Sequence, residues 1–127
     1  MKLFNVMDSM VGVITGAGVN KSNIHAAENA LGTSFSPEYR AYLERYGIAA
    51  VNGHELTGIS KSARTNVVSV TQNAKLVHEA DADWYVIEQT NIDGIVIWQS
   101  SNGAIYQTLP NAKARKLCES MADFIEL

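Results

Sequence analysis

The stretch Ala27–Gly47, AENALGTSFSPEYRAYLERYG, predicts two short helices joined by a specific turn. Apolar side chains at Ile24, Ala27 and Leu31 recur three and four residues apart, which is the spacing of one helix face. Gly32 follows them as a stop, because glycine readily adopts the left-handed conformation that ends many helices. The first helix of the pair is therefore expected to end at this glycine.

The second helix of the pair is predicted to begin at Ser36-Pro37-Glu38. The serine side chain can accept a hydrogen bond from the free N–H groups of the first turn, and proline suits the first helical position. The glutamate complements the positive end of the helix dipole. Gly47 closes this helix. Its apolar face follows the i, i+3, i+4, i+7 pattern, with Tyr39, Tyr42, Leu43 and Tyr46.

The composition is that of an ordinary globular chain. We expect one domain over residues 1–127, because this length is typical of a single domain. Apolar residues make up 46% and charged residues 18%, which argues against disorder. The formal net charge of −3 argues against direct nucleic-acid binding, since phosphate contacts require a basic surface.

The sequence favours the cytoplasm as the location of the protein. Cys118 is the only cysteine, so no disulfide can form within the chain. Asn5 and Asp8 interrupt the apolar residues near Met1, which argues against a secretory signal. No stretch approaches the roughly 20 apolar residues of a membrane span, so we expect no membrane association.

The flanking segments predict further helices and a first strand. Residues 2–15 carry apolar side chains at helical spacing, so a helix is expected there, ended by Gly16-Ala17-Gly18. Residues 54–59 are interpreted as a short strand and residues 60–66 as a loop. Residues 67–80 are ambiguous between strand and helix, and we favour a short helical or irregular crossover.

The second half of the chain predicts an antiparallel meander followed by a helix. Three runs, residues 84–90, 95–99 and 104–107, are separated by the turn signals Asp93-Gly94 and Asn102-Gly103. The middle run is apolar on both faces, so we expect a central strand covered by helices on one side and by loops or a partner on the other. The C-terminal helix is predicted from the spacing of Leu117, Met121, Phe124 and Ile125. The fold class is therefore α+β, with helices flanking an antiparallel sheet.

No pattern in the chain indicates a catalytic, cofactor or metal site. The glycines of residues 13–18 resemble the start of a dinucleotide-binding loop, but the final glycine and the βαβ unit are missing. His25, His54 and His78 are dispersed and lack metal-ligand spacing. A nucleophilic pair of Cys118 with a histidine that is distant in the sequence but close in the fold stays open as an alternative. We expect the cysteine instead to be a small buried hydrophobe on the C-terminal helix.

An acidic run before the meander and the aromatic residues within it are the best candidates for contacts with a partner. The run is read either as a solvated loop or as a negative patch that meets a basic partner. Aromatic residues are mostly core residues, but they also dominate binding hot spots. The candidate residues for partner binding are Glu79, Asp81, Asp83, Tyr85, Glu88, Asp93 and Trp98.

Taken together, these patterns resemble the SUKH superfamily (Smi/Knr-like proteins), most closely its compact bacterial YobK-like members. The resemblance covers residues 20–127. It rests on the residue pattern of 24–47 and on four later groups: Glu55-Leu56-x-Gly58-Ile59, Trp84-Tyr85-Val86-Ile87, Asn102-Gly103-x-Ile105-Tyr106 and Ser120-x-x-Asp123-Phe124-Ile125. It implies an α+β fold with a strongly curved antiparallel sheet, and it carries over no catalytic residue.

The resemblance implies a binding role. The leading hypothesis is an immunity protein, a cytoplasmic antidote that occludes a cognate toxin domain, often a nuclease, by stoichiometric binding. The alternative is a general intracellular interaction or scaffold module of the Smi/Knr type without a toxin partner. A small enzyme is a third hypothesis, which requires a pocket with convergent polar groups. We expect no cofactor, and a monomer or a weak homodimer.

Overall fold

The computed structural model describes residues 1–127 and contains five helices and seven strands. The helices are α1 (Lys2–Ser9), α2 (Lys21–Leu31), α3 (Pro37–Tyr46), α4 (Val67–Ala74) and α5 (Met121–Ile125). None of them has both the length and the apolar character needed to cross a bilayer.

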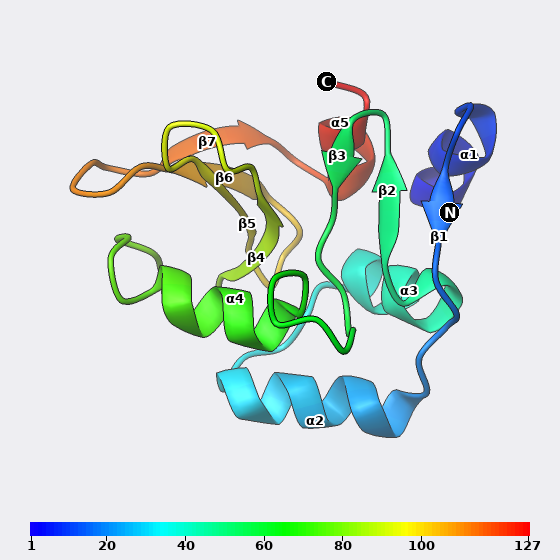
Figure 1. Ribbon diagram of the computed structural model, residues 1–127, viewed down its shortest axis with the longest axis horizontal. Coiled ribbons are helices and arrows are strands. Elements are labelled where there is room, and N and C mark those ends of the chain that lie inside the picture. Colours follow the sequence, from blue (N-terminus) through cyan, green and yellow to red (C-terminus); the bar gives the residue numbers. More distant parts are fainter.

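The seven strands form two antiparallel sheets, which confirms the predicted α+β class. One sheet has the order β1 (Ile14–Thr15), β2 (Ala49–Val51) and β3 (His54–Glu55). The other is a meander of β4 (Tyr85–Gln89), β5 (Val96–Gln99), β6 (Ile105–Thr108) and β7 (Arg115–Cys118). Figure 1 shows the meander with α4 at one end of the molecule and the smaller sheet with α1 at the other.

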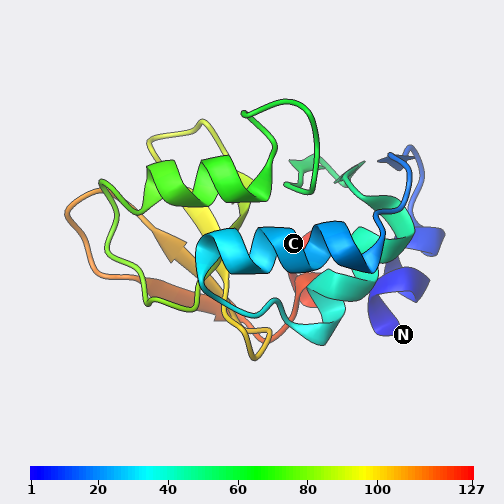
Figure 2. The same cartoon turned by 90° about the horizontal axis from the view of Figure 1, so that it is seen from below.

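Helices α2 and α3 form as their local sequence signals predict. Gly32 ends α2 in the left-handed conformation, with φ of 66°. The Ser36 hydroxyl caps α3 by accepting a hydrogen bond from the Tyr39 amide at 3.0 Å, and Gly47 ends that helix at φ of 71°. Helix α2 also lies beside α4, as the view from below shows (Figure 2).

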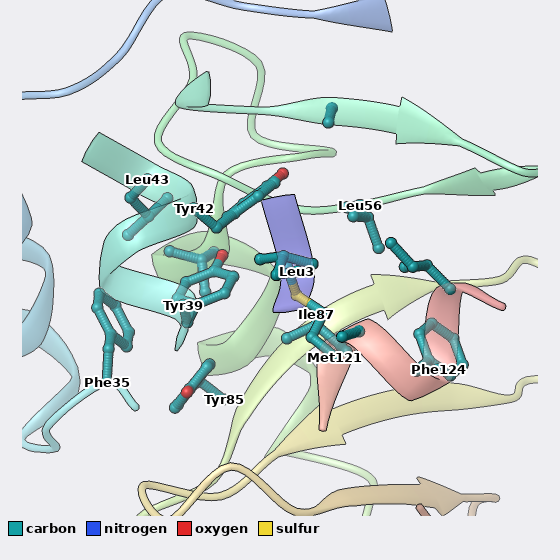
Figure 3. Close-up of a cluster of buried hydrophobic side chains, with 14 of the residues drawn as sticks. Leu3, Phe35, Tyr39, Tyr42, Leu43, Leu56, Tyr85, Ile87, Met121 and Phe124 are labelled. Atoms are coloured by element: carbon teal, nitrogen blue, oxygen red, sulfur yellow. The ribbon is translucent and has the colours of Figure 1, made fainter. Parts of the chain in front are cut away.

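The main core lies between α3, α1, α5 and the inner faces of both sheets (Figure 3). Three tyrosines are fully buried in it, and all three phenol groups are hydrogen-bonded. The Tyr39 hydroxyl bonds the Thr57 hydroxyl at 2.9 Å, and the Tyr42 hydroxyl donates to the Thr57 carbonyl at 2.7 Å. The Tyr85 hydroxyl donates to Gln99 at 2.8 Å. Burial raises the pKa of each of these phenols, so they stay neutral.

A second, smaller core lies on the other face of the meander, beneath α4. Strand β5 alternates between the two cores, because successive side chains of a strand point to opposite faces. Ile97 belongs to the main core, whereas Val96 and Trp98 belong to the smaller one. The predicted central strand with helices on one side is confirmed. The prediction of loops or a partner on its other side is wrong, because the main core with its helices covers that face.

The N-terminal region differs from the prediction. The first helix ends at Ser9 instead of continuing to residue 15, and Ile14–Thr15 forms β1 by pairing with Ala49 and Ala50 of β2. The turn between helix and strand contains Gly12 at φ of 77°. Residues 54–59 are predicted as one strand, but only His54–Glu55, which is β3, belongs to a sheet.

The C-terminal helix is shorter than predicted. Leu117 and Cys118 lie on β7, where Cys118 pairs with Ile105 of β6 and Leu117 lies at a register shift, and α5 begins only after Ser120, which caps it. The placement of Cys118 in a helix is therefore wrong. The ambiguous residues 67–80 are helical over Val67–Ala74 and irregular afterwards, as favoured.

Candidate partner-binding surface

The histidines and the cysteine are not assembled into a metal or nucleophile site. No group of three or more His, Cys, Asp or Glu side chains is positioned to hold a metal ion. His25 lies near Glu28, His54 pairs with Glu88, and His78 bonds Thr108. The Cys118 thiol contacts the Ser120 carbonyl, and burial raises its pKa, which disfavours the reactive thiolate.

Three of the seven candidate partner-binding residues lie in the interior. Tyr85 and Trp98 are fully buried, and Glu88 is 7% exposed. Each has an internal partner: Tyr85 bonds Gln99, the Trp98 indole donates to Thr108 at 2.7 Å, and Glu88 pairs with His54 at 2.8 Å. These three side chains support the fold and are removed from the candidate surface, because both faces of the meander are covered.

Asp83 has a positioning role within the acidic run. Its Oδ2 accepts hydrogen bonds from the Ser101 amide at 3.0 Å and from the Ser101 hydroxyl at 2.7 Å. Burial alone would raise the pKa of this carboxyl, but the hydrogen bonds from Ser101, a bond to its own backbone amide and the charge of Lys75 together outweigh burial, and the pKa is lowered. Asp83 therefore ties the start of β4 to the β5–β6 turn.

The remaining three candidates, Glu79, Asp81 and Asp93, are exposed, and their carboxylates make no hydrogen bond or ion pair within the protein. Two of them lie in the loop between α4 and β4, which faces the β6–β7 loop at one end of the molecule (Figures 1 and 2). We call residues 75–83 and 109–114 the paired-loop surface. Asp93 lies near it, because a side chain at the neighbouring Gly94 would meet the ring of Pro110.

Exposed apolar side chains accompany the carboxylates on the paired-loop surface. Leu76 is 81% exposed and Val77 is 62% exposed, and Leu109 is also exposed. A shallow hollow of about 260 Å³ separates the two loops, with Trp84 at its floor and Lys113 at its edge. Trp84 stacks on Tyr106 with ring centroids 4.1 Å apart. Exposed apolar side chains that lie together distinguish this end of the molecule from the rest of the candidate residues.

Hydrogen bonds hold the α4–β4 loop in place. The Val77 and His78 amides both donate to the Ala74 carbonyl, at 3.2 and 2.9 Å. The Lys75 ammonium donates to the Ala82 carbonyl at 2.9 Å. His78 Nδ1 lies 2.7 Å from the Thr108 hydroxyl, which links this loop to the end of β6. The surface is thus preorganised, which lowers the entropic cost of binding.

His78 makes the stability of this loop depend on pH. Burial lowers the pKa of His78 below its ordinary value of 6.5, so the unfolded chain binds the proton more tightly than the folded protein. The stabilisation from the neutral ring is complete above the unfolded-state pKa and is lost as the pH falls through the folded-state pKa. We expect the urea midpoint to fall between about pH 7.5 and pH 5.5.

The control for this prediction is His78→Gln, which keeps an acceptor for the Thr108 hydroxyl but cannot titrate in this range. Its urea midpoint should fall less over the same pH interval than that of the unchanged protein. Equal slopes for the two proteins would show that His78 does not contribute to the acid sensitivity.

Sequence reasoning missed the apolar part of this surface. Val77 continues the helical stripe of Val70 and Ala74, and on that pattern it belongs to a core. In the structure α4 ends at Ala74, so Leu76 and Val77 leave the helix and face the solvent. The sequence signal for this surface is the position of Leu76 and Val77, two apolar residues that come shortly before the acidic run.

A comparison with known protein families identifies the family of this chain. The family model SUKH_5, described as SMI1-KNR4 cell-wall, matches residues 7–126. The chain belongs to the SUKH family. No curated protein matches it. The residues that carried the resemblance in this SUKH protein have structural roles: Glu28 is buried and accepts hydrogen bonds from the Phe35 amide and from Arg40, and Tyr39 and Tyr42 fill the core.

Proposed function

We propose that this SUKH protein is an immunity protein that binds a cognate toxin domain in the cytoplasm and blocks it by stoichiometric occlusion. The observation that carries the proposal is the paired-loop surface, where Leu76 and Val77 are exposed beside the unpaired carboxylates of Glu79 and Asp81. Membership of a family that includes immunity proteins supports it. A binding role also agrees with a family that is not known for enzymatic activity.

The charge of the surface indicates the kind of toxin. Glu79, Asp81 and the neighbouring Asp93 are free to meet cations, while Lys113 is the basic residue of the hollow. A nuclease domain carries a basic surface where it holds phosphate groups. Acidic side chains on the antidote complement that surface, speed the association and exclude partners of the same charge. We therefore propose a nuclease-type toxin domain as the partner.

The direct test is co-expression with the C-terminal domain of a toxin encoded by a neighbouring gene. We expect cells to survive, and the two purified proteins to form a complex of equal stoichiometry. Sedimentation of the free protein should show a monomer or a weak homodimer. Absence of both protection and a complex would contradict the immunity function. Recovery of unrelated intracellular partners from a gene without a neighbouring toxin would instead favour the scaffold role.

Substitutions on the paired-loop surface sharpen the test. Leu76→Asp and Val77→Asp should each weaken toxin binding by about tenfold or more, the loss typical of apolar contact residues at the centre of an interface. The matched control is Val11→Asp. It makes the same change in charge at a side chain that is 99% exposed in the α1–β1 turn, at the opposite end of the molecule (Figure 1). It should leave both affinity and protection unchanged.

The free energy of unfolding separates a lost contact from a lost fold. All three side chains are exposed, so the three variants should unfold within about 0.5 kcal/mol of the unchanged protein. If Leu76→Asp and Val77→Asp bind the toxin as tightly as Val11→Asp does, the paired-loop surface is not the contact surface, although the immunity function could still hold on another face.

A further inference from the structure

The four-stranded meander has two edges, and the chain itself covers only one of them. At the β4 edge, the Ile87 carbonyl accepts a hydrogen bond from the Thr57 amide at 2.8 Å. The Val86 amide donates to the Thr71 hydroxyl of α4 at 2.9 Å, and α4 packs on β4. The other edge is β7, which lies on the far side of the meander from α4 (Figures 1 and 2). We call the outer side of Arg115–Cys118 the β7 edge.

The backbone of the β7 edge is open. Only β6 forms backbone hydrogen bonds with this strand, and no side chain bonds its amides or carbonyls. Alternate residues of an antiparallel strand point both backbone groups away from their neighbour, so the outer side of β7 presents unpaired N–H and C=O groups. A register shift at Leu117 confines the regular part of the edge to Arg115 and Lys116. This part of the edge is a template for one further strand.

Basic side chains are concentrated at the β7 edge. Residues 94–118 contain three of them, Lys113, Arg115 and Lys116, and no acidic residue, in a chain whose formal net charge is −3. All three are exposed. Lys116 pairs with Glu119, and Lys113 borders the hollow of the paired-loop surface. Arg115 makes no hydrogen bond or ion pair within the protein, so its charge is free to meet an anionic group of a partner.

Arg115 and Lys116 lie on opposite faces of the sheet. Residues directly opposite each other on two antiparallel strands share a face, and Arg115 pairs with Gln107 whereas Lys116 pairs with Tyr106. Tyr106 stacks on Trp84 of the smaller core, so Lys116 lies on the α4 face of the sheet and Arg115 on the face of the main core. The side chains of a strand added beside β7 would alternate in the same way. Two consecutive acidic residues on that strand would therefore meet one cation each.

We propose that the β7 edge binds an extended acidic segment of a protein partner as an added strand, with two consecutive acidic side chains beside Arg115 and Lys116. The open backbone supplies the hydrogen bonds of the added strand, and the charge of the edge selects an acidic sequence. A second copy of this chain is disfavoured, because two β7 edges side by side would bring like charges together. The inference is independent of the proposed toxin, which would meet the paired-loop surface with a basic one.

The test is a titration of the intact protein with a short peptide, blocked at both ends, in which threonine and valine residues flank two consecutive glutamates. The peptide should shift the backbone NMR signals of Arg115–Cys118 in a saturable manner and slow the exchange of amide hydrogens on β7. Replacing both glutamates of the peptide by glutamine should weaken binding about threefold or more. An absence of saturable shifts on β7, or equal affinity of the two peptides, would overturn the proposal.

Methylation of single peptide amides tests the addition of a strand. Alternate amides of an added strand face its neighbour, so N-methylation at one of the two glutamates should abolish binding, whereas N-methylation at the other should change the affinity by no more than about twofold. Equal effects at both positions would show a contact through charge alone and would contradict strand addition. Tighter binding of a single-stranded oligonucleotide than of the peptide at the β7 edge would assign the edge to nucleic acid instead.

An exchange of charge tests the two cations. The double variant Arg115→Glu/Lys116→Glu should bind the glutamate peptide about tenfold or more weakly and should prefer a peptide with lysines in place of the glutamates. The matched control is Lys61→Glu, which makes the same change at an exposed side chain without a hydrogen bond or an ion pair, and which should keep the original preference. All three side chains are exposed, so the variants should fold, as circular dichroism can check. A double variant that still prefers the glutamate peptide would contradict the role of these charges.

Discussion

Replacing Trp98 by alanine is expected to lower the free energy of unfolding by about 3–5 kcal/mol, measured by urea denaturation. The indole is the largest fully buried side chain in the protein and fills the smaller core beneath α4. The ring centroids of Trp98 and Trp84 lie 6.3 Å apart, so removal of the Trp98 indole leaves a cavity beside Trp84. It also removes the indole N–H that donates to the Thr108 hydroxyl at 2.7 Å. Trp84 remains as the fluorescent reporter.

Two milder variants separate the causes of this loss. Trp98→Phe keeps most of the apolar volume and should cost less than the alanine substitution, because the cavity is smaller. Thr108→Val removes the acceptor of the indole N–H together with the bond to His78, so it should show the joint cost of both, of which the buried indole donor left unpaired contributes about 1–3 kcal/mol. Near-normal stability of Trp98→Ala would show that the indole is not a core residue and would return it to the candidate contact surface.

The features that sequence reasoning predicted correctly are those with local signals. Gly32, Ser36 and Gly47 specify helix ends through interactions with residues three or four positions away, so α2 and α3 could be predicted from the sequence. The Asp93-Gly94 turn joins β4 to β5 for the same reason, and both residues adopt positive φ there.

The features that it missed depend on pairing between distant residues. Ile14 becomes part of a strand only because it pairs with Ala50, 36 positions later, and no local pattern encodes this pairing. Leu117 and Cys118 fall on the helical stripe of Met121 and Ile125, yet they extend the meander because β6 offers a free edge to them. Short apolar runs are ambiguous by periodicity alone.

The candidate contact residues could be sorted only with both cores known. Because side chains alternate along a strand, Trp84 and Tyr85 are predicted to point to opposite faces of the sheet. This alternation does not predict that both faces are covered. The exposed Glu79 and Asp81 were predicted correctly as loop residues, because charged side chains are rarely buried without partners. Glu88 is the exception, and its partner, His54, lies 34 positions away.

Glu38 shows how a correct local interpretation can miss the main role of a residue. It lies in the first turn of α3, where a carboxylate favours the helix dipole. In the structure it also caps α5: Oε1 accepts from the Met121 amide at 2.7 Å and Oε2 from the Ala122 amide at 3.0 Å. Gln99 of β5 donates to Oε1 at 2.8 Å. One carboxylate therefore joins α3, the meander and the C-terminal helix.

We expect Glu38→Gln to lower the free energy of unfolding by about 2–4 kcal/mol, the scale of one to two charge-assisted hydrogen bonds. Glutamine has nearly the same shape, but its amide nitrogen would face a backbone N–H of α5 as a second donor. One of the two amides that Glu38 caps, Met121 or Ala122, would then lack its acceptor, so these amides at the start of the five-residue helix should also lose protection from hydrogen exchange.

The matched control is Glu44→Gln, which makes the same chemical change on the same helix at an exposed side chain without a hydrogen bond or an ion pair. It should change the stability by no more than about 0.5 kcal/mol. If the two variants are equally stable, the cap on α5 contributes nothing. If Glu38→Gln is destabilised while the α5 amides keep their protection, the loss comes from the bond to Gln99. If protection is lost only in α5, the lost stability comes from the cap. The cap then also holds Phe124 of α5 in its position against the meander.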